Sequence, residues 1–491
     1  MTQPPPEQLH AALNELSWTL RDSANPMDAL EVLFTLVLLK RASDVADGTS
    51  GGGSWNTPQQ ARWNYIRESS HTAAVLNNAC RALEAANPLL EGVLRDIDFH
   101  RLRALHSVSE QNLVLRRAMS VLDRCSLSQQ DVPDEVLGRA CTRLLDEWAV
   151  SAKHLRELNL TPQNIVRLLV ELMEPQPGMS VCDPVCAFGT TLTECAQYVA
   201  ERQGQGLAMA GSHLRLEGQE RTTSLWRICR LNLLLHGFRD ARIERGDVLR
   251  EPMLREGGAL SRYDRVLAHP PFSARWAADY AEADPDHRFR FGVPPRNQGD
   301  FAFIQHVLST LRQRGRAAVL AFPAVLFRGG ADTRIRQGII EANLLEAVVL
   351  LPENALFTTG VAPTVLVFNA DVTRKTRDEI LFVDASKEGT RDGTRGRRRN
   401  VLQEQHIAHI TSTVRKRHVE PGFSRRVPLD EVAANGFDLQ LRRYITSLEE
   451  EEEPARPDLA QLAVELAECE HARDSAAARM DELLGRLRLK D

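Results

Sequence analysis

The chain has 491 residues, of which 43% are hydrophobic and 26% charged, a balance typical of globular proteins and not of disordered or membrane chains. This length predicts two to four domains. The longest apolar run near the start, residues 32–39, is far shorter than the roughly 20 residues that span a bilayer. Because no basic segment precedes an apolar run at the start, a secretory leader is not expected, and the cytoplasm is the expected location.

The charge and the cysteine spacing bear on DNA binding, metal binding and disulfide formation. The net charge is −5, but residues 449–491 carry −7 and the remainder +2. A near-neutral body with an acidic tail does not exclude DNA binding, since local patches matter more than the sum. The eight cysteines contain no CxxC pair, so neither a zinc site nor a disulfide framework is expected, and no metal site is predicted.

Residues 1–150 are predicted to form an all-helical N-terminal domain. Apolar side chains recur at helical spacing at Leu30, Leu33, Phe34 and Val37, and residues 73–94 and 111–122 show similar patterns.

The hydrophobic pattern changes at about residue 151, and the pattern of residues 151–370 predicts an α/β domain. Short apolar or β-branched runs lie at 179–182, 214–217, 262–268, 317–322, 345–351 and 364–368. Helical patterns lie between most of them, at 161–173, 190–202, 222–236, 300–314 and 332–343. This alternation predicts a doubly wound, mostly parallel, Rossmann-like sheet with helices on both faces. Ligands bind such sheets at the carboxyl ends of the strands.

The pattern loosens after residue 370. Residues 371–448 are predicted to extend the α/β domain and hold two basic clusters, at 390–400 and 415–418. Residues 449–491 are predicted to form an acidic linker and a helical C-terminal tail. Apolar side chains recur along this tail at alternating spacings of three and four, typical of a coiled-coil seam: Leu459, Leu462, Leu466, Cys469, Ala476, Met480, Leu483 and Leu487. A helix that binds a partner and a helix that packs on its own chain both fit this pattern.

Four segments at predicted strand ends carry candidate chemistry. Residues 181–191 (VCDPVCAFGTT) join a strand to a helix, where backbone N–H groups can face a ligand. Glu220 ends the next strand, where an acid can hold ribose hydroxyls, and Asp247 follows a further strand. Each of these alone is also a common structural turn.

The fourth segment runs from a strand directly into His269-Pro270-Pro271-Phe272. Two prolines fix the chain and lack N–H groups, so nearby carbonyls stay free to accept hydrogen bonds. A rigidly held aromatic ring at this edge can stack on a flat base.

Together these segments resemble the modification (M) subunit of type I restriction–modification systems, an N6-adenine DNA methyltransferase. The matching segments are 183–189, 218–220, 232–237, 246–247, 269–272, 300–306, 326–330, 358–363 and 436–439. The resemblance implies a seven-stranded methyltransferase sheet, S-adenosyl-L-methionine as cofactor, and an adenine flipped out of double-stranded DNA. It also implies a specificity (S) subunit, a second M subunit and, in some complexes, a restriction or translocase subunit as partners, with no membrane.

The same resemblance implies the site residues. The catalytic segment is His269, Pro270, Pro271 and Phe272. The cofactor-binding residues are Leu158, Asn159, Leu160, Thr161, Pro162, Gln163, Asp183, Phe188, Gly189, Thr190, Glu220 and Asp247.

Three departures from the family pattern leave two functions open. His269 replaces the family's catalytic Asn, Ala187-Phe188-Gly189 replaces Gly-Ser-Gly, and Leu158-Asn159-Leu160 replaces an aromatic-rich run. A neutral histidine offers one acceptor nitrogen and a protonated one none, and an unperturbed imidazole titrates at about 6.5. Losing one positioned polar contact costs on the order of 10²–10³ in rate. The chain is therefore either an adenine methyltransferase or a pseudo-methyltransferase that acts as a DNA-binding or assembly subunit.

Overall fold

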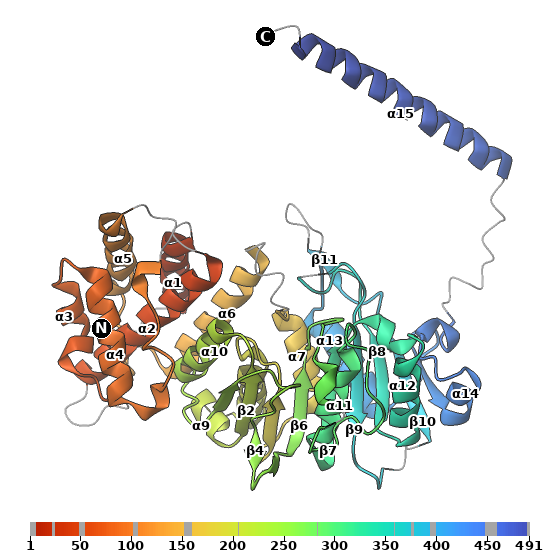
Figure 1. Ribbon diagram of the computed structural model, residues 1–491, viewed down its shortest axis with the longest axis horizontal. Helices are drawn as coiled ribbons and strands as arrows, with labels where there is room; N and C mark the ends of the chain where they lie inside the picture. Colours follow the sequence, from red (N-terminus) through yellow and green to blue (C-terminus); the bar gives the residue numbers. More distant parts are fainter. Residues whose placement is uncertain are drawn as a thin grey trace.

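The computed structural model describes residues 6–21, 25–48, 55–101, 107–151, 160–204, 206–281, 283–357, 359–374, 378–392, 399–446 and 459–488. Figure 1 shows a helical N-terminal part beside an α/β body, with the C-terminal helix drawn apart from both.

The N-terminal part consists of helices, as the periodicity predicts. They are α1 (Pro6–Arg21), α2 (Pro26–Gly48), η1 (Gln59–Ala61), α3 (Trp63–Arg67), α4 (Thr72–Ala86), η2 (Pro88–Leu90), η3 (Phe99–Arg101), α5 (Val108–Asp123) and α6 (Asp134–Ser151). The predicted helix over residues 73–94 is wrong beyond Ala86, because Pro88 begins a separate 3₁₀ turn. Helix α2 is buried along most of its length, so it forms the centre of this part.

A nine-stranded sheet forms the body, in the order β13-β10-β8-β9-β7-β6-β1-β2-β3. Its strands are β1 (Ser180–Asp183), β2 (Arg215–Glu220), β3 (Arg242–Arg245), β6 (Tyr263–Ala268), β7 (Leu311–Ala321), β8 (Leu345–Leu350), β9 (Thr364–Asn369), β10 (Glu379–Asp384) and β13 (Ser424–Pro428). Strand β9 runs antiparallel to β7 and β8, and β13 runs antiparallel to β10, while the other pairs are parallel. The predicted doubly wound, mostly parallel sheet is confirmed. Its seven strands from β3 to β8 are extended by β10 and β13.

Helices cover both faces of this sheet. The body's helices are α7 (Gln163–Met173), α8 (Thr190–Gln203), α9 (Leu207–Ser212), α10 (Thr223–Leu235), η5 (Ala278–Tyr280), α11 (Asp300–Ser309), η6 (Pro323–Leu326), α12 (Ala331–Glu341), α13 (Glu404–Lys416), α14 (Leu429–Ala434) and η7 (Leu441–Arg443). Side chains of α7, α8, α10 and α13 share one core cluster with the N-terminal helices, while α11, α12 and α14 belong to a second. The predicted helix over 300–314 is wrong after Ser309, because Leu311 pairs with Tyr263 in the sheet.

Two short hairpins lie outside the main sheet: β4 (Arg255–Glu256) with β5 (Ala259–Leu260), and β11 (Thr390–Asp392) with β12 (Arg399–Val401). The second hairpin forms the ends of the segment 390–400, which the sequence predicts as a basic loop.

The N-terminal helices are joined to the body mainly through α10. Arg227 of α10 pairs with Glu31 of α2 at 3.5 Å and with Asp96 at 3.3 Å. Helix α6 approaches α10 closely at Gly138, where a Cβ atom would lie 2.3 Å from the ring of His236. Helix α6 therefore follows the body towards the carboxyl ends of β1 and β6.

The C-terminal tail is helical, as predicted, and forms α15 (Leu459–Arg488). Three of its large apolar side chains are well exposed: Val464 at 59%, Leu466 at 62% and Met480 at 59%. Within the described residues, no helix has the length and apolar character needed to cross a membrane.

Candidate cofactor and DNA site

The loop between β1 and α8 forms the floor of the candidate site. Asp183 ends β1 and is buried, and its carboxylate accepts the N–H of Val185 at 3.1 Å. Burial raises the pKa of Asp183 to about 7. Ala187 has φ 44°, in the left-handed region that favours glycine, and Gly189 has φ 75° at the N-cap of α8. The backbone of the loop therefore has two residues in the left-handed region, and one of them is an alanine instead of a glycine.

Glu220 ends β2 and faces this loop. Its Oε2 accepts the N–H of Ala187 at 3.1 Å, and its Oε1 accepts the N–H of Thr222 at 2.7 Å. The side chain is buried, and burial raises its pKa. Both carboxylate oxygens, which the resemblance assigns to the cofactor ribose, thus bond to this chain's own backbone.

Asp247 follows β3 in a turn of its own. Its carboxylate accepts the N–H of Leu249 at 3.0 Å and lies 3.9 Å from Arg221 Nη1.

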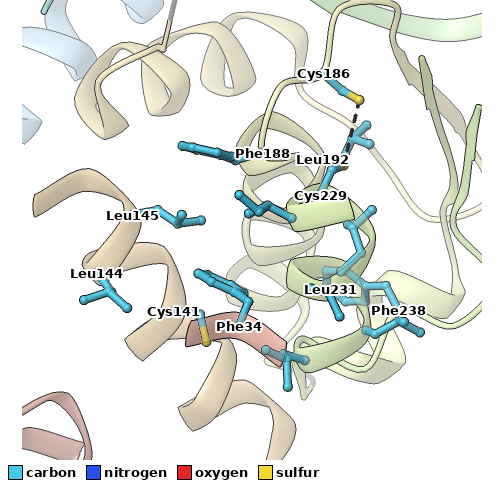
Figure 2. Close-up of a cluster of buried hydrophobic side chains, with 14 of the residues drawn as sticks. Phe34, Cys141, Leu144, Leu145, Cys186, Phe188, Leu192, Cys229, Leu231 and Phe238 are labelled. Carbon is cyan, nitrogen blue, oxygen red and sulfur yellow. Dashed lines mark hydrogen bonds between the residues drawn. The ribbon is translucent and has the colours of Figure 1, made fainter. Parts of the chain in front are cut away.

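Phe188 belongs to the hydrophobic core. It is only 3% exposed, and its backbone oxygen accepts the side-chain amide of Asn232 at 2.9 Å. In Figure 2 its ring points from the loop towards the side of α6, and the side chain of Leu145 lies below the ring in this view. The phenyl ring therefore belongs to the core cluster that the body shares with the helical N-terminal part.

His269 follows β6 and is buried. Its Nδ1 lies 2.7 Å from Thr161 Oγ1. Burial lowers the pKa of His269 to about 3, so the ring is neutral at physiological pH. The unperturbed value near 6.5 therefore does not apply to this ring.

The rest of the catalytic segment keeps an aromatic ring beside the histidine. Pro270 is buried, whereas Pro271 and Phe272 are half-buried. The Phe272 ring centroid lies 5.2 Å from that of His269 and 5.8 Å from that of Phe322.

A carboxylate holds the backbone that follows Phe272. Asp300 accepts the N–H of Ser273 at 2.9 Å and pairs with Arg328 at 3.0 Å. Two segments that the sequence singles out separately, 300–306 and 326–330, thus meet beneath the catalytic loop.

One small cavity lies among these residues, with a volume of about 30 Å³. Seven sequence-predicted site residues line it: Leu160, Thr161, Gln163, Asp183, Phe188, Thr190 and His269. Seven others do not line it: Pro162, Gly189, Glu220, Asp247, Pro270, Pro271 and Phe272. Leu158 and Asn159 lie outside the described residues.

Comparison with known proteins identifies the family. Residues 132–453 match the family model described as N-6 DNA Methylase, and residues 9–122 match the HsdM N-terminal domain. The chain belongs to the N-6 DNA methylase family. The resemblance to type I modification subunits, which the motifs predict, is confirmed.

Relatives of this N-6 DNA methylase chain include two curated proteins. The methylase subunit of the type I restriction enzyme MjaVII of Methanocaldococcus jannaschii is 29% identical over 433 residues, covering 86% of this chain and 71% of that protein. The HindI methylase subunit of Haemophilus influenzae is 25% identical over 422 residues, covering 81% and 91%. The solved type I methyltransferase subunit of Streptococcus thermophilus has the same fold, with a TM-score of 0.78 at 23% identity, covering 90% of this chain and all of that one.

The family implies S-adenosylmethionine as the cofactor. The carboxylates that would face it are Asp183 at the end of β1, Glu220 at the end of β2 and Asp247 after β3. Two residues of the loop after β1 depart from the family pattern: Ala187 has a left-handed φ of 44°, and the side chain of Phe188 is buried. The cavity of about 30 Å³ is only one part of this site, since neither Glu220 nor Asp247 lines it.

Sequence reasoning missed the contribution of α6. Four of its residues, Thr142, Leu145, Asp146 and Ala149, line the cavity. They precede the recognised motifs, and their helical pattern indicates only a buried face. The large residue at Phe188, where the family has serine, was the one available signal that another element lies against the loop.

Proposed function

We propose that this chain is the modification-type subunit of a type I restriction–modification-like complex, and that it serves there as a DNA-binding and assembly subunit without methyl transfer. His269 carries this proposal. It replaces the family's catalytic amide with a buried, neutral ring, so the adenine amine loses a positioned carbonyl acceptor.

Two side chains support a lost or weakened activity. Phe188, buried in the hydrophobic core, stands where the family has serine. His269 replaces the family's amide with a buried neutral ring next to Thr161.

The proposed partners are double-stranded DNA, an S-type specificity subunit and a second M subunit, with a restriction or translocase subunit as a further member. The exposed apolar side chains of α15 support docking on another protein's helices. The tail's net charge of −7 repels phosphates, which favours a protein partner for α15 over DNA.

A second candidate is an active N6-adenine methyltransferase. The half-buried ring of Phe272, at the carboxyl end of β6, favours this function because it remains able to stack on a base.

Isothermal titration of S-adenosylmethionine into the purified full chain tests the proposal. We expect no binding at millimolar cofactor, together with DNA retention by the chain assembled with its specificity subunit in a gel-shift assay. Micromolar cofactor binding, with transfer of a radiolabelled methyl group to DNA, would establish the second candidate instead.

A further inference from the structure

We infer that Asp300 is a positioning residue for Phe272: by binding the backbone directly after Phe272, it fixes the direction in which that ring meets an extrahelical base. The inference rests on the DNA binding that the proposed function includes, and it does not require methyl transfer. It concerns the loop after β6 and the elements that hold this loop, which are α11, η6 and α12.

The residue after Phe272 has a backbone conformation that needs support. Ser273 has φ 49°, in the left-handed region that a residue with a Cβ atom rarely adopts. Such a conformation persists only where surrounding contacts fix it, and such positions cluster at ligand-binding sites. Ser273 is exposed, so the packing of its own side chain does not fix it. Its N–H donates to Asp300 Oδ1 at 2.9 Å, and this bond holds the turn.

Asp300 is itself held from the other side. It is the first residue of α11 and only 3% exposed, and its Oδ2 lies 3.0 Å from Arg328 Nη1. The same nitrogen lies 3.0 Å from Asp332 Oδ2 on α12, and Arg328 Nη2 lies 3.5 Å from Ser273 Oγ. Arg328 therefore joins α11, α12 and the loop after β6. The Asp300 carboxylate has little freedom to follow the loop, so the loop must follow the carboxylate.

A second tie comes from backbone atoms and does not depend on the Asp300 side chain. The N–H of Gly299 donates to the oxygen of Ala274 at 2.9 Å. A Cβ atom at Gly299 would lie 2.9 Å from that oxygen, so the two segments approach as closely as a glycine allows. This tie should persist when the Asp300 side chain is removed. What would be lost is the bond at Ser273, next to Phe272.

The ring of Phe272 is sensitive to the direction of this turn. Its neighbours are the rings of His269 and Phe322, with centroids at 5.2 and 5.8 Å and planes tilted by 58° and 48°. Neither ring is parallel to Phe272, and its side chain is half-buried. Because a base stacks face to face on an aromatic ring, a changed backbone direction at Ser273 should weaken stacking.

The test measures stacking as a ratio of two affinities. The full chain assembled with its specificity subunit is titrated with two duplexes that carry the recognition sequence. One has the target adenine in a mismatch, which lowers the cost of flipping, and the other has an abasic position there. Stacking of one base on one aromatic ring is worth about 5- to 150-fold in affinity, and we expect a ratio in this range for the natural chain. A general loss of DNA binding lowers both affinities and leaves the ratio unchanged.

Four variants separate positioning from a structural role. Asp300→Ala should lower the ratio to that of Phe272→Ala, whereas Asp300→Asn, which keeps an oxygen acceptor for the Ser273 N–H, should retain most of it. Asp384→Ala is the matched control. Asp384 ends β10 and accepts the N–H of Ser386 at 3.0 Å, so this variant also removes one bond from a carboxylate to the backbone. It should leave the ratio unchanged.

The outcomes distinguish this inference from the proposed function. No retention of either duplex by the natural complex would refute both. Equal affinities for the two duplexes would overturn the inference alone and leave DNA binding standing. A folded Asp300→Ala protein with the natural ratio would show that Asp300 does not position the ring. If Asp300→Ala fails to fold, Arg328→Gln, which releases Asp300 from its ion pair, takes its place, and a natural ratio there overturns the inference in the same way.

Discussion

His269 shows how burial changes the chemistry expected of a residue type. Its ring is neutral well below physiological pH, because burial lowers its pKa to about 3. Protonation therefore does not remove its acceptor capacity near neutrality. What differs from an amide is the shape of the ring and its position beside Thr161.

Methyl transfer should recover only when two obstacles are removed together. His269→Asn restores the family's amide, but Ala187 and Phe188 remain in the cofactor loop, where the family has glycine and serine. We expect no methylation from His269→Asn alone and methylation from the triple variant Ala187→Gly, Phe188→Ser, His269→Asn. That triple variant should exceed the double variant Ala187→Gly, Phe188→Ser, which retains His269, by on the order of 10²-fold. The assay is transfer of a radiolabelled methyl group to partner-matched DNA, and equal rates with and without His269 would remove it as an obstacle.

Glu220 should contribute to stability. Its carboxylate accepts two backbone N–H groups and is buried. Glu220→Ala should lower the free energy of unfolding by roughly 1.5–3 kcal/mol, the range for a hydrogen bond to a charged group. Urea denaturation measures this change. Glu220→Gln keeps one acceptor oxygen and should lose less, so equal losses in the two variants would contradict the assignment.

Individual motif residues could be located from the sequence, but their surroundings could not. Residues after β1, β2 and β6 meet because the carboxyl ends of parallel strands share one edge. The orientation of the Phe188 ring and the position of α6 beside the loop after β1 depend on packing between segments that are far apart in the chain. No local pattern encodes that contact.

At the scale of elements, the strands that alternate with helical patterns before residue 370 were predictable, and the two main-sheet strands after it were not. Strand β10 has a buried run of only four residues, which periodicity alone does not distinguish from a loop. Strand β13 reads SRRVP, with two arginines on an edge strand, a common protection of sheet edges against aggregation. Both strands were missed for these reasons.

Helix α15 should be needed for assembly and not for folding. A chain ending at Glu453 should remain folded and lose co-purification with the specificity subunit. A sharper test uses two exposed residues of the helix, Leu466 at 62% on the predicted seam and Val464 at 59% outside it. Leu466→Asp should abolish co-purification, whereas Val464→Asp, the matched control, should preserve it. Loss in both variants, or in neither, would contradict a specific seam.

For the molecule as a whole, the order of a helical N-terminal part, an α/β body and a helical tail was predictable from changes in the hydrophobic pattern along the chain. The attachment of the helical part to α10 was not. His236 lies at this junction, and burial lowers its pKa to about 4. Its Nδ1 lies 2.8 Å from the oxygen of Asn232, a geometry that makes this nitrogen the donor and leaves Nε2 to accept from Thr142 of α6. The neutral ring therefore joins the two parts.

The junction should weaken in acid through His236. Because its folded pKa, about 4, is below the reference value of 6.5, the unfolded chain binds more protons between these values. Its contribution is complete above pH 6.5 and declines as the pH falls towards 4. The decline is about 1.4 kcal/mol per pH unit and reaches about 3 kcal/mol in total. Urea unfolding of the natural protein and His236→Gln, measured from pH 7.5 to 5, isolates this contribution, because oppositely shifted groups such as Asp183 are common to both proteins. The stability difference between the two proteins should shrink steadily below pH 6.5, and parallel curves would show that His236 is not held neutral at the junction.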